Sequence, residues 1–128
     1  MNCLFCAIAA GEIPSAKVYE DEQVYAFKDI APQGPVHVLI IPKKHIDSMQ
    51  AAGPEDDGLL CQMLAAARQI ARELGVDKTG YRLITNVGPD AGQSVPHLHL
   101  DSDQTEGPSS RLSRTTKLVL AVTIGAPW

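Results

Sequence analysis

Residues 86–100 constrain the fold of this chain more than any other segment. They begin as a loop rich in turn-forming residues and end in the alternating sequence His97-Leu98-His99-Leu100. Side chains at positions i and i+2 of a β-strand point to the same face. The two leucines are therefore expected in the core, with the two histidines side by side on the opposite face. Paired histidines that are merely exposed or hydrogen-bonded are the simpler interpretation, but small polar donors precede them at 92–95, which favours an anion site.

The hydrophobic pattern of the whole chain predicts an α+β fold, an antiparallel sheet with one long helix packed on it. The helix covers residues 59–74, where apolar side chains recur at helical spacing from Leu60 to Leu74, and Gly75 ends it. Cys61 lies within this helix and is predicted to be a small packing residue. A short helix is expected between Cys6 and Gly11. Strands are predicted over 17–19, 24–27, 36–41, 81–85 and 97–100.

The length, composition and net charge of the chain are those of one globular domain. The chain has 128 residues, a net charge of -4 and a pI near 5.4, so no broad basic field favours nucleic-acid partners. No apolar run reaches the length of a membrane span. Three cysteines are an odd number, which argues against a disulfide framework and favours a reducing, cytoplasmic location.

The character of the sequence changes after residue 100. Residues 101–110 are polar and rich in breakers, and residues 118–124 are apolar and partly β-branched. We therefore divide the chain into a domain over 1–100 and a divergent tail over 101–128. The apolar part of the tail is a candidate terminal strand.

Several motifs spread over residues 1–100 resemble, in order, those of the histidine triad (HIT) family, and most closely its Hint-like nucleotide hydrolases. They are Cys3-Leu-Phe-Cys6, Gly11-Glu-Ile-Pro14, Phe27-Lys-Asp-Ile30, Pro32-Gln-Gly-Pro35, Val36-His37, Ile41-Pro-Lys-Lys-His-Ile46, Tyr81-Arg82, Asn86, Gly92-Gln-Ser-Val95 and His97-Leu-His99. The resemblance implies a HIT-like fold, a homodimer and a purine nucleotide or nucleoside phosphoramidate as ligand.

The resemblance also implies a role for each matching residue. His99 is the expected nucleophile, which attacks the α-phosphorus and forms a nucleotidyl-histidine that water then hydrolyses. His97, His37 and Ser94 are expected to assist it. The residues expected to bind the nucleotide are Phe27, Asp29, Ile30, Asn86, Gly92, Gln93, Ser94, Val95, His99 and Asp101. Taken singly, Asp29 and Asn86 are also typical of turn and cap residues.

A structural zinc site is a further expectation. The spacing of Cys3 and Cys6 is that of half a tetrahedral site. The resemblance implies that His45 and His97 complete it. Two reduced cysteines beside a surface histidine are the alternative.

The third histidine of the family pattern is replaced by Asp101. A carboxylate only accepts hydrogen bonds and repels a phosphate, so nucleotide binding is expected to be weaker and turnover slower if Asp101 points into the pocket. Three interpretations therefore stay open: a HIT-type hydrolase, a nucleotide-binding protein with little catalysis, and a zinc-stabilised interaction domain.

Overall fold

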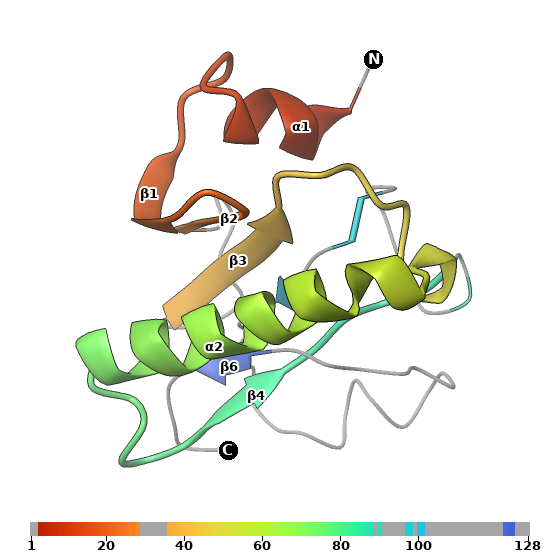
Figure 1. The fold of residues 1–128 in the computed structure, drawn as a ribbon. Coiled ribbons are helices and arrows are strands. Elements are labelled where there is room, and N and C mark those ends of the chain that lie inside the picture. The colour runs from red at the N-terminus through yellow and green to blue at the C-terminus, as the bar shows by residue number, and fades with distance from the viewer. Residues whose placement is uncertain are drawn as a thin grey trace.

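The computed structural model describes residues 3–28, 36–88, 90, 97–98, 100–101 and 122–124, with the backbone alone at 36, 101 and 122–124. Two helices and six strands are found in these residues (Figure 1). In chain order the elements are α1 (Leu4–Ala9), β1 (Ala16–Glu20), β2 (Val24–Lys28), β3 (Val36–Pro42), α2 (Asp57–Glu73), β4 (Tyr81–Leu83), β5 (Leu100–Asp101) and β6 (Val122–Ile124). Two single turns of 3₁₀-helix, Met49–Ala51 and Pro54–Asp56, precede α2. The predicted α+β class is confirmed.

The first three strands form an antiparallel meander. The β1–β2 turn is set by Asp21, whose Oδ1 accepts hydrogen bonds from the backbone N–H groups of Gln23 and Val24, both at 2.8 Å. Strand β2 then pairs with β3 along its whole length, from Val24 opposite Pro42 to Lys28 opposite Val38. This register places the apolar residues of both strands in matching rows.

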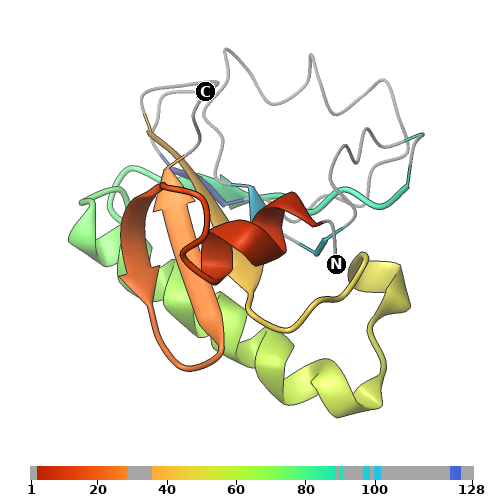
Figure 2. The same cartoon turned by 90° about the horizontal axis from the view of Figure 1, so that it is seen from above.

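Two apolar clusters lie on the two faces of this sheet, and each is covered by a different helix (Figure 2). The long helix α2 covers the face that carries Val24, Ala26, Val38 and Ile40. The short helix α1 covers the other face, where Phe5 and Ile8 pack against Tyr25, Phe27, Leu39 and Ile41. The alternation of side chains along β2 and β3 produces these two faces.

Helix α2 confirms the predicted helix, with differences at its ends and in its buried face. It begins at Asp57 and ends at Glu73, and Gly75 adopts a φ of 75° just beyond the helix end. Leu59 is buried in place of Leu60, and Leu74, the C-cap residue, is exposed. The prediction that Cys61 packs in the core is wrong: it is exposed, since it lies on the helix face opposite Met63.

The short helix α1 begins two residues before the predicted start. Cys3 is its N-cap, and the Sγ atom of Cys3 accepts a hydrogen bond from the backbone N–H of Cys6 at 3.4 Å. A cysteine is not among the usual capping residues, which is why the sequence pattern placed the start too late. This cap brings both cysteines to the first turn of α1.

The edge of β3 opposite β2 pairs with two strands, β5 and β6. Strand β5 pairs antiparallel with Leu39 and Ile40, and β6 pairs antiparallel with Val36 and His37. Strand β6 also pairs with β4, so it lies between β3 and β4 (Figure 1). Residues 122–124 of the tail thus complete the sheet. The regular strands are shorter than predicted here, because β4 ends at Leu83 and β5 starts at Leu100.

Neither described helix combines the length and the apolar content required to cross a bilayer.

Candidate functional site

Four metal-ligating side chains from three distant segments meet beside α1. Cys3 and Cys6 come from the start of α1, His45 from the segment after β3, and His97 from the segment before β5. One sulfur or nitrogen atom from each residue lies within 4.8 Å of the atoms from the other three. The Sγ atom of Cys6 is 3.3 Å from Nδ1 of His45 and 3.4 Å from Nδ1 of His97. The Sγ atom of Cys3 is 3.3 Å from the same Nδ1 of His97.

The orientation of His97 is fixed by both of its ring nitrogens. Its side chain is completely buried, and its Nε2 lies 2.9 Å from the carbonyl oxygen of Pro42. A carbonyl only accepts hydrogen bonds, so the N–H of a neutral imidazole is at Nε2. The lone pair at Nδ1 therefore faces the sulfur atoms of Cys3 and Cys6, as a metal ligand requires.

His45 is oriented in the same way. Its Nε2 lies 2.7 Å from Oδ1 of Asp47, and a carboxylate likewise only accepts. Its Nδ1 therefore faces Cys6. The imidazole rings of His45 and His97 are nearly perpendicular, with centroids 4.9 Å apart.

The three S···N separations fit a tetrahedral zinc ion. Zinc–sulfur bonds of about 2.3 Å and zinc–nitrogen bonds of about 2.0–2.1 Å place tetrahedral S and N ligands roughly 3.5 Å apart. The S···N separations of 3.3–3.4 Å match this value. Without a metal, burial and the hydrogen bond with Cys3 raise the pKa of the Cys6 thiol to about 11. A divalent cation reverses that preference, because coordinated thiols are deprotonated.

The segment after β3 is also joined directly to residues 97–98, called here the histidine segment, by a backbone hydrogen bond. The backbone N–H of Leu98 donates to the carbonyl of Ile46. The side chains of Leu98 and Leu100 are buried in the cluster under α2, as predicted. On the other face, the ring of Phe5 meets His97 edge-on, with centroids 5.9 Å apart.

Of the predicted nucleotide-binding and catalytic residues, Phe27 and His37 lie on the α1 face of the sheet. Phe27 is buried and makes an edge contact with Phe5 at a centroid distance of 5.8 Å. His37 is also buried and precedes Leu39 by two residues on β3, so it shares that face.

Asn86, another predicted binding residue, is half-buried after β4. Its side-chain oxygen is fully shielded from solvent, and none of the described residues hydrogen-bonds to it. A buried acceptor of this kind is costly unless a donor reaches it.

The remaining predicted residues of this site fall outside the described residues: Asp29, Ile30, Gly92, Gln93, Ser94, Val95 and His99. Only the backbone of Asp101 is described. It lies in β5 and pairs with the backbone of Leu39 in β3. The four predicted metal ligands, by contrast, are all described and all brought together.

Three contributors to the site were not predicted. They are the carboxylate of Asp47, the carbonyl of Pro42 and the ring of Phe5. Only Asp47 left a sequence signal, because a carboxylate close in sequence to a candidate ligand histidine is a common second partner of that ring. The other two depend on tertiary packing.

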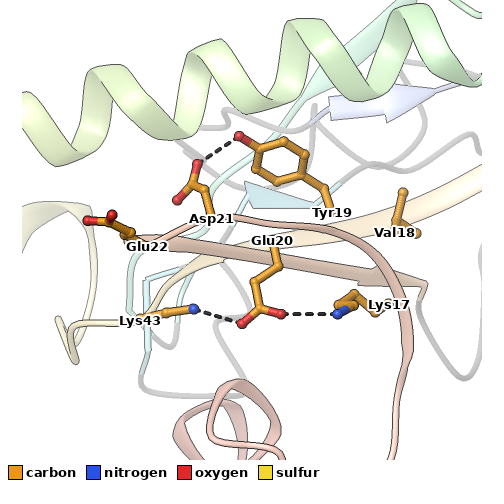
Figure 3. Close-up of a pocket in the computed structure, with 7 residues that line it drawn as sticks. All are labelled: Lys17, Val18, Tyr19, Glu20, Asp21, Glu22 and Lys43. Carbon is orange, nitrogen blue, oxygen red and sulfur yellow. Dashed lines mark hydrogen bonds and ion pairs between the residues drawn. The ribbon is translucent and has the colours of Figure 1, made fainter.

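Elsewhere on the surface, the described residues line two open hollows. The hollow on the β1–β2 hairpin has a volume of about 640 Å³ (Figure 3). In it, Glu20 pairs with both Lys43 at 2.7 Å and Lys17 at 3.1 Å, and these ammonium groups lower the pKa of Glu20. The second hollow, of about 450 Å³, lies between residues 22–23 and the start of α2. Neither is lined by a histidine or a cysteine, so we place the candidate site at the Cys/His cluster and the adjoining sheet face.

A known family matches most of the chain. Residues 10–101 match the HIT domain. The chain is a member of the HIT family. The matched region ends at the start of the tail, where the HIT motifs also end.

Individual HIT proteins are similar over most of the chain. HitA of Neisseria gonorrhoeae is 46% identical over 99 residues, which cover 77% of this chain and 92% of HitA. An uncharacterized HIT-like protein of Synechocystis is 50% identical over 99 residues, covering 77% of this chain and 86% of its own length.

Solved HIT structures share the fold. The HIT family hydrolase of Legionella pneumophila is 49% identical with a TM-score of 0.77, and covers 78% of this chain and 89% of its own. The HIT family hydrolase of Clostridium thermocellum is 48% identical with a TM-score of 0.78, and covers 84% and 95%.

Proposed function

We propose that this chain is a HIT-type hydrolase that cleaves purine nucleoside phosphoramidates, or related nucleotides, at the α-phosphate. The observation that carries the proposal is that residues 10–101 match the HIT domain, and that similar solved chains are HIT family hydrolases. Buried Phe27 and His37 on one sheet face, beside the segment that leads to His99, support a substrate site on that face.

The proposed reaction has two displacements. An unprotonated ring nitrogen of His99 attacks the α-phosphorus, the phosphorus–nitrogen bond of the phosphoramidate breaks, and the amine leaves after it accepts a proton. Water then attacks the same phosphorus, which releases the nucleoside monophosphate and the free imidazole. Each displacement has a lower barrier than direct hydrolysis by water.

The neighbouring residues have supporting roles in this proposal. Asp29 accepts hydrogen bonds from the ribose hydroxyls, while Phe27 and Ile30 line the base pocket. Ser94 and the backbone and side-chain donors of Gly92, Gln93 and Val95 surround the phosphate. The buried oxygen of Asn86 is an acceptor for an N–H or O–H of the substrate or of that loop. His37 assists His99.

In the proposed site, His97 acts through the metal cluster. Its Nδ1 faces two sulfurs and its Nε2 a carbonyl, so it fixes the segment that His99 follows two residues later in the sequence. We propose zinc as the ion, held by Cys3, Cys6, His45 and His97, because two sulfur and two imidazole ligands at tetrahedral spacing select it. When bound, the ion ties α1 to the histidine segment. Elemental analysis of protein purified without chelator tests this, and one zinc per chain is expected.

A nucleotide-binding protein with little catalysis is the second candidate, and Asp101 is the observation that favours it. An ionised carboxylate near the phosphate offers no donor to the leaving group. Titration calorimetry with adenosine or guanosine monophosphate separates both nucleotide functions from a pure interaction domain, in which neither nucleotide binds.

The deciding experiment is hydrolysis of adenosine 5′-phosphoramidate. The wild-type chain is expected to release adenosine monophosphate, and His99→Ala is expected to lose this activity while it still binds the product. A nucleotidyl adduct trapped on the wild type, and absent from His99→Ala, supports the two-step path. Binding without any release supports the second candidate.

A homodimer is also proposed. Helix α2 presents half-buried Leu60 and Leu64, which with Met49, Met63 and Leu100 line an apolar cavity of about 40 Å³. Light scattering after gel filtration is expected to give twice the chain mass of 13.7 kDa.

A further inference from the structure

The carboxylate of Asp47 lies directly behind one of the candidate metal ligands. Its Oδ1 is 2.7 Å from Nε2 of His45, while Nδ1 on the opposite side of that ring faces Cys6 at 3.3 Å. The side chain of His45 is 25% exposed and that of Asp47 is 69% exposed. A contact this exposed adds little to folding stability by itself.

The tautomer of His45 depends on which group faces Nε2. A neutral imidazole carries one N–H and one lone pair, and only the nitrogen with the lone pair can bind a metal. The carboxylate of Asp47 accepts the Nε2–H, which leaves the lone pair at Nδ1, on the side of the cluster. Without such an acceptor, the proton is free to occupy Nδ1 and the ring is free to rotate.

We propose that Asp47 is the positioning residue of the metal centre, and this inference rests on the zinc site proposed above. Asp47 does not touch the ion. It holds His45 in the tautomer and orientation that ligation requires, and its negative charge strengthens the imidazole as a ligand.

In both histidines of the cluster, Nε2 faces a hydrogen-bond acceptor outside the cluster, but the two acceptors differ in kind. Behind His97 the acceptor is the main-chain carbonyl of Pro42, at 2.9 Å and buried. Behind His45 the acceptor is a side chain, at 2.7 Å and exposed. A substitution at Asp47 can therefore remove the acceptor behind His45 while all four candidate ligands are kept.

Zinc affinity is the measurement that tests this role, by competition with a chromophoric chelator on the full chain. Asp47→Ala is expected to bind zinc about 10–100-fold more weakly than the wild type. Asp47→Asn is expected to stay within a few-fold, because the amide oxygen still accepts the Nε2–H. Asp77→Ala, which removes an exposed carboxylate from the turn after α2, is the matched control and is expected to bind as the wild type does.

Cobalt-loaded protein supplies a readout that a purely structural role does not move. The visible ligand-field bands of bound Co²⁺ are expected to change shape and intensity in Asp47→Ala and to be retained in Asp47→Asn. Circular dichroism of the metal-free variants establishes that all of them are equally folded.

Two negative results are distinguishable. If Asp47→Ala binds zinc as tightly as Asp77→Ala, with an unchanged cobalt spectrum, the role of Asp47 is overturned while the metal centre stands. If the wild type itself takes up no zinc or cobalt, the metal centre is refuted and this inference with it. The proposed hydrolysis at His99 is measured separately and is not decided by either result.

Discussion

Nε2 of His97 and the carbonyl oxygen of Pro42 are 2.9 Å apart, a buried contact between residues separated by 55 positions in the sequence. It joins the end of β3 to the segment that enters β5, and it sets which nitrogen of His97 faces Cys3 and Cys6. The same histidine thus connects the candidate metal cluster to the end of β3. The predictions below test this arrangement and the surrounding fold.

Loss of one thiol is expected to remove the metal and lower thermal stability. In Cys6→Ser the cluster loses the sulfur that contacts both His45 and His97. With free zinc at about 100 times the dissociation constant, the bound ion adds about 2.7 kcal/mol to the free energy of unfolding, which corresponds to roughly 10 °C in Tm for a chain of this size. Differential scanning calorimetry with and without zinc measures it. Cys61→Ser, at an exposed position of α2, is the control and should melt like the wild type.

Restoration of the third histidine is expected to raise the rate of hydrolysis. Asp101→His replaces an acceptor-only carboxylate with a group that can donate to a phosphate oxygen or the leaving group. One well-aimed donor typically changes the rate about 10²–10³-fold. Steady-state hydrolysis of adenosine 5′-phosphoramidate checks this, and Asp101→Ala separates removal of the charge from gain of the donor. Equal rates in all three proteins contradict the assignment of Asp101 as the obstacle.

Truncation of a core leucine next to His97 is expected to destabilise the fold strongly. Leu98 is almost fully buried in the cluster under α2, so Leu98→Ala leaves a cavity and lowers the free energy of unfolding by about 2–5 kcal/mol. The same change at exposed Leu74 is expected to cost less than about 0.5 kcal/mol. Urea denaturation compares the two, and similar losses refute the burial of Leu98.

A pH dependence is expected from Asp21. Burial acts to raise the pKa of Asp21, but hydrogen bonds from Tyr19, Gln23, Val24 and Gln62 outweigh it and lower the pKa below the ordinary 3.8. The unfolded state therefore binds the proton more readily, so the stability contributed by this carboxylate is complete above about pH 4 and is lost as the pH falls through the folded pKa.

Removal of this carboxylate measures that contribution. Asp21→Ala is expected to be about 1–2 kcal/mol less stable than the wild type at pH 7, and the difference should shrink below the ordinary pKa. Chemical denaturation at a series of pH values checks it, with Asp77→Ala as the carboxylate control. A difference that stays constant down to pH 2 contradicts the argument.

Strand β6 is expected to contribute to stability although it lies in the tail. It has a partner on each side, β3 and β4, so Thr123→Pro removes a ladder hydrogen bond whichever way its N–H points. The expected loss is about 1–3 kcal/mol, measured by urea denaturation. Thr123→Val keeps a β-branched residue and serves as the control. If both variants match the wild type, the tail does not hold this strand in solution.

The local pattern of the sequence was sufficient for most elements of the fold. The apolar alternation over residues 36–41 predicts β3, and the helical spacing that ends at Gly75 predicts α2, because burial of one face dictates both periods. The pair Cys3 and Cys6 indicates half of a metal site by spacing alone. The family motifs supplied the other half, His45 and His97.

The sequence by itself determined the list of candidate ligands and the class of fold. The tertiary structure decided how these ligands are arranged in space. Residues 3, 6, 45 and 97 form one cluster only because α1 packs on the sheet and the segment after β3 passes beside the histidine segment. The carbonyl of Pro42, which orients the ring of His97, and the insertion of β6 between β3 and β4 depend on the same packing, whereas Asp47 is a sequence neighbour of His45. Local sequence patterns report which face of an element is buried, whereas contacts between distant segments are set by the assembled sheet, and these decide the geometry of the site.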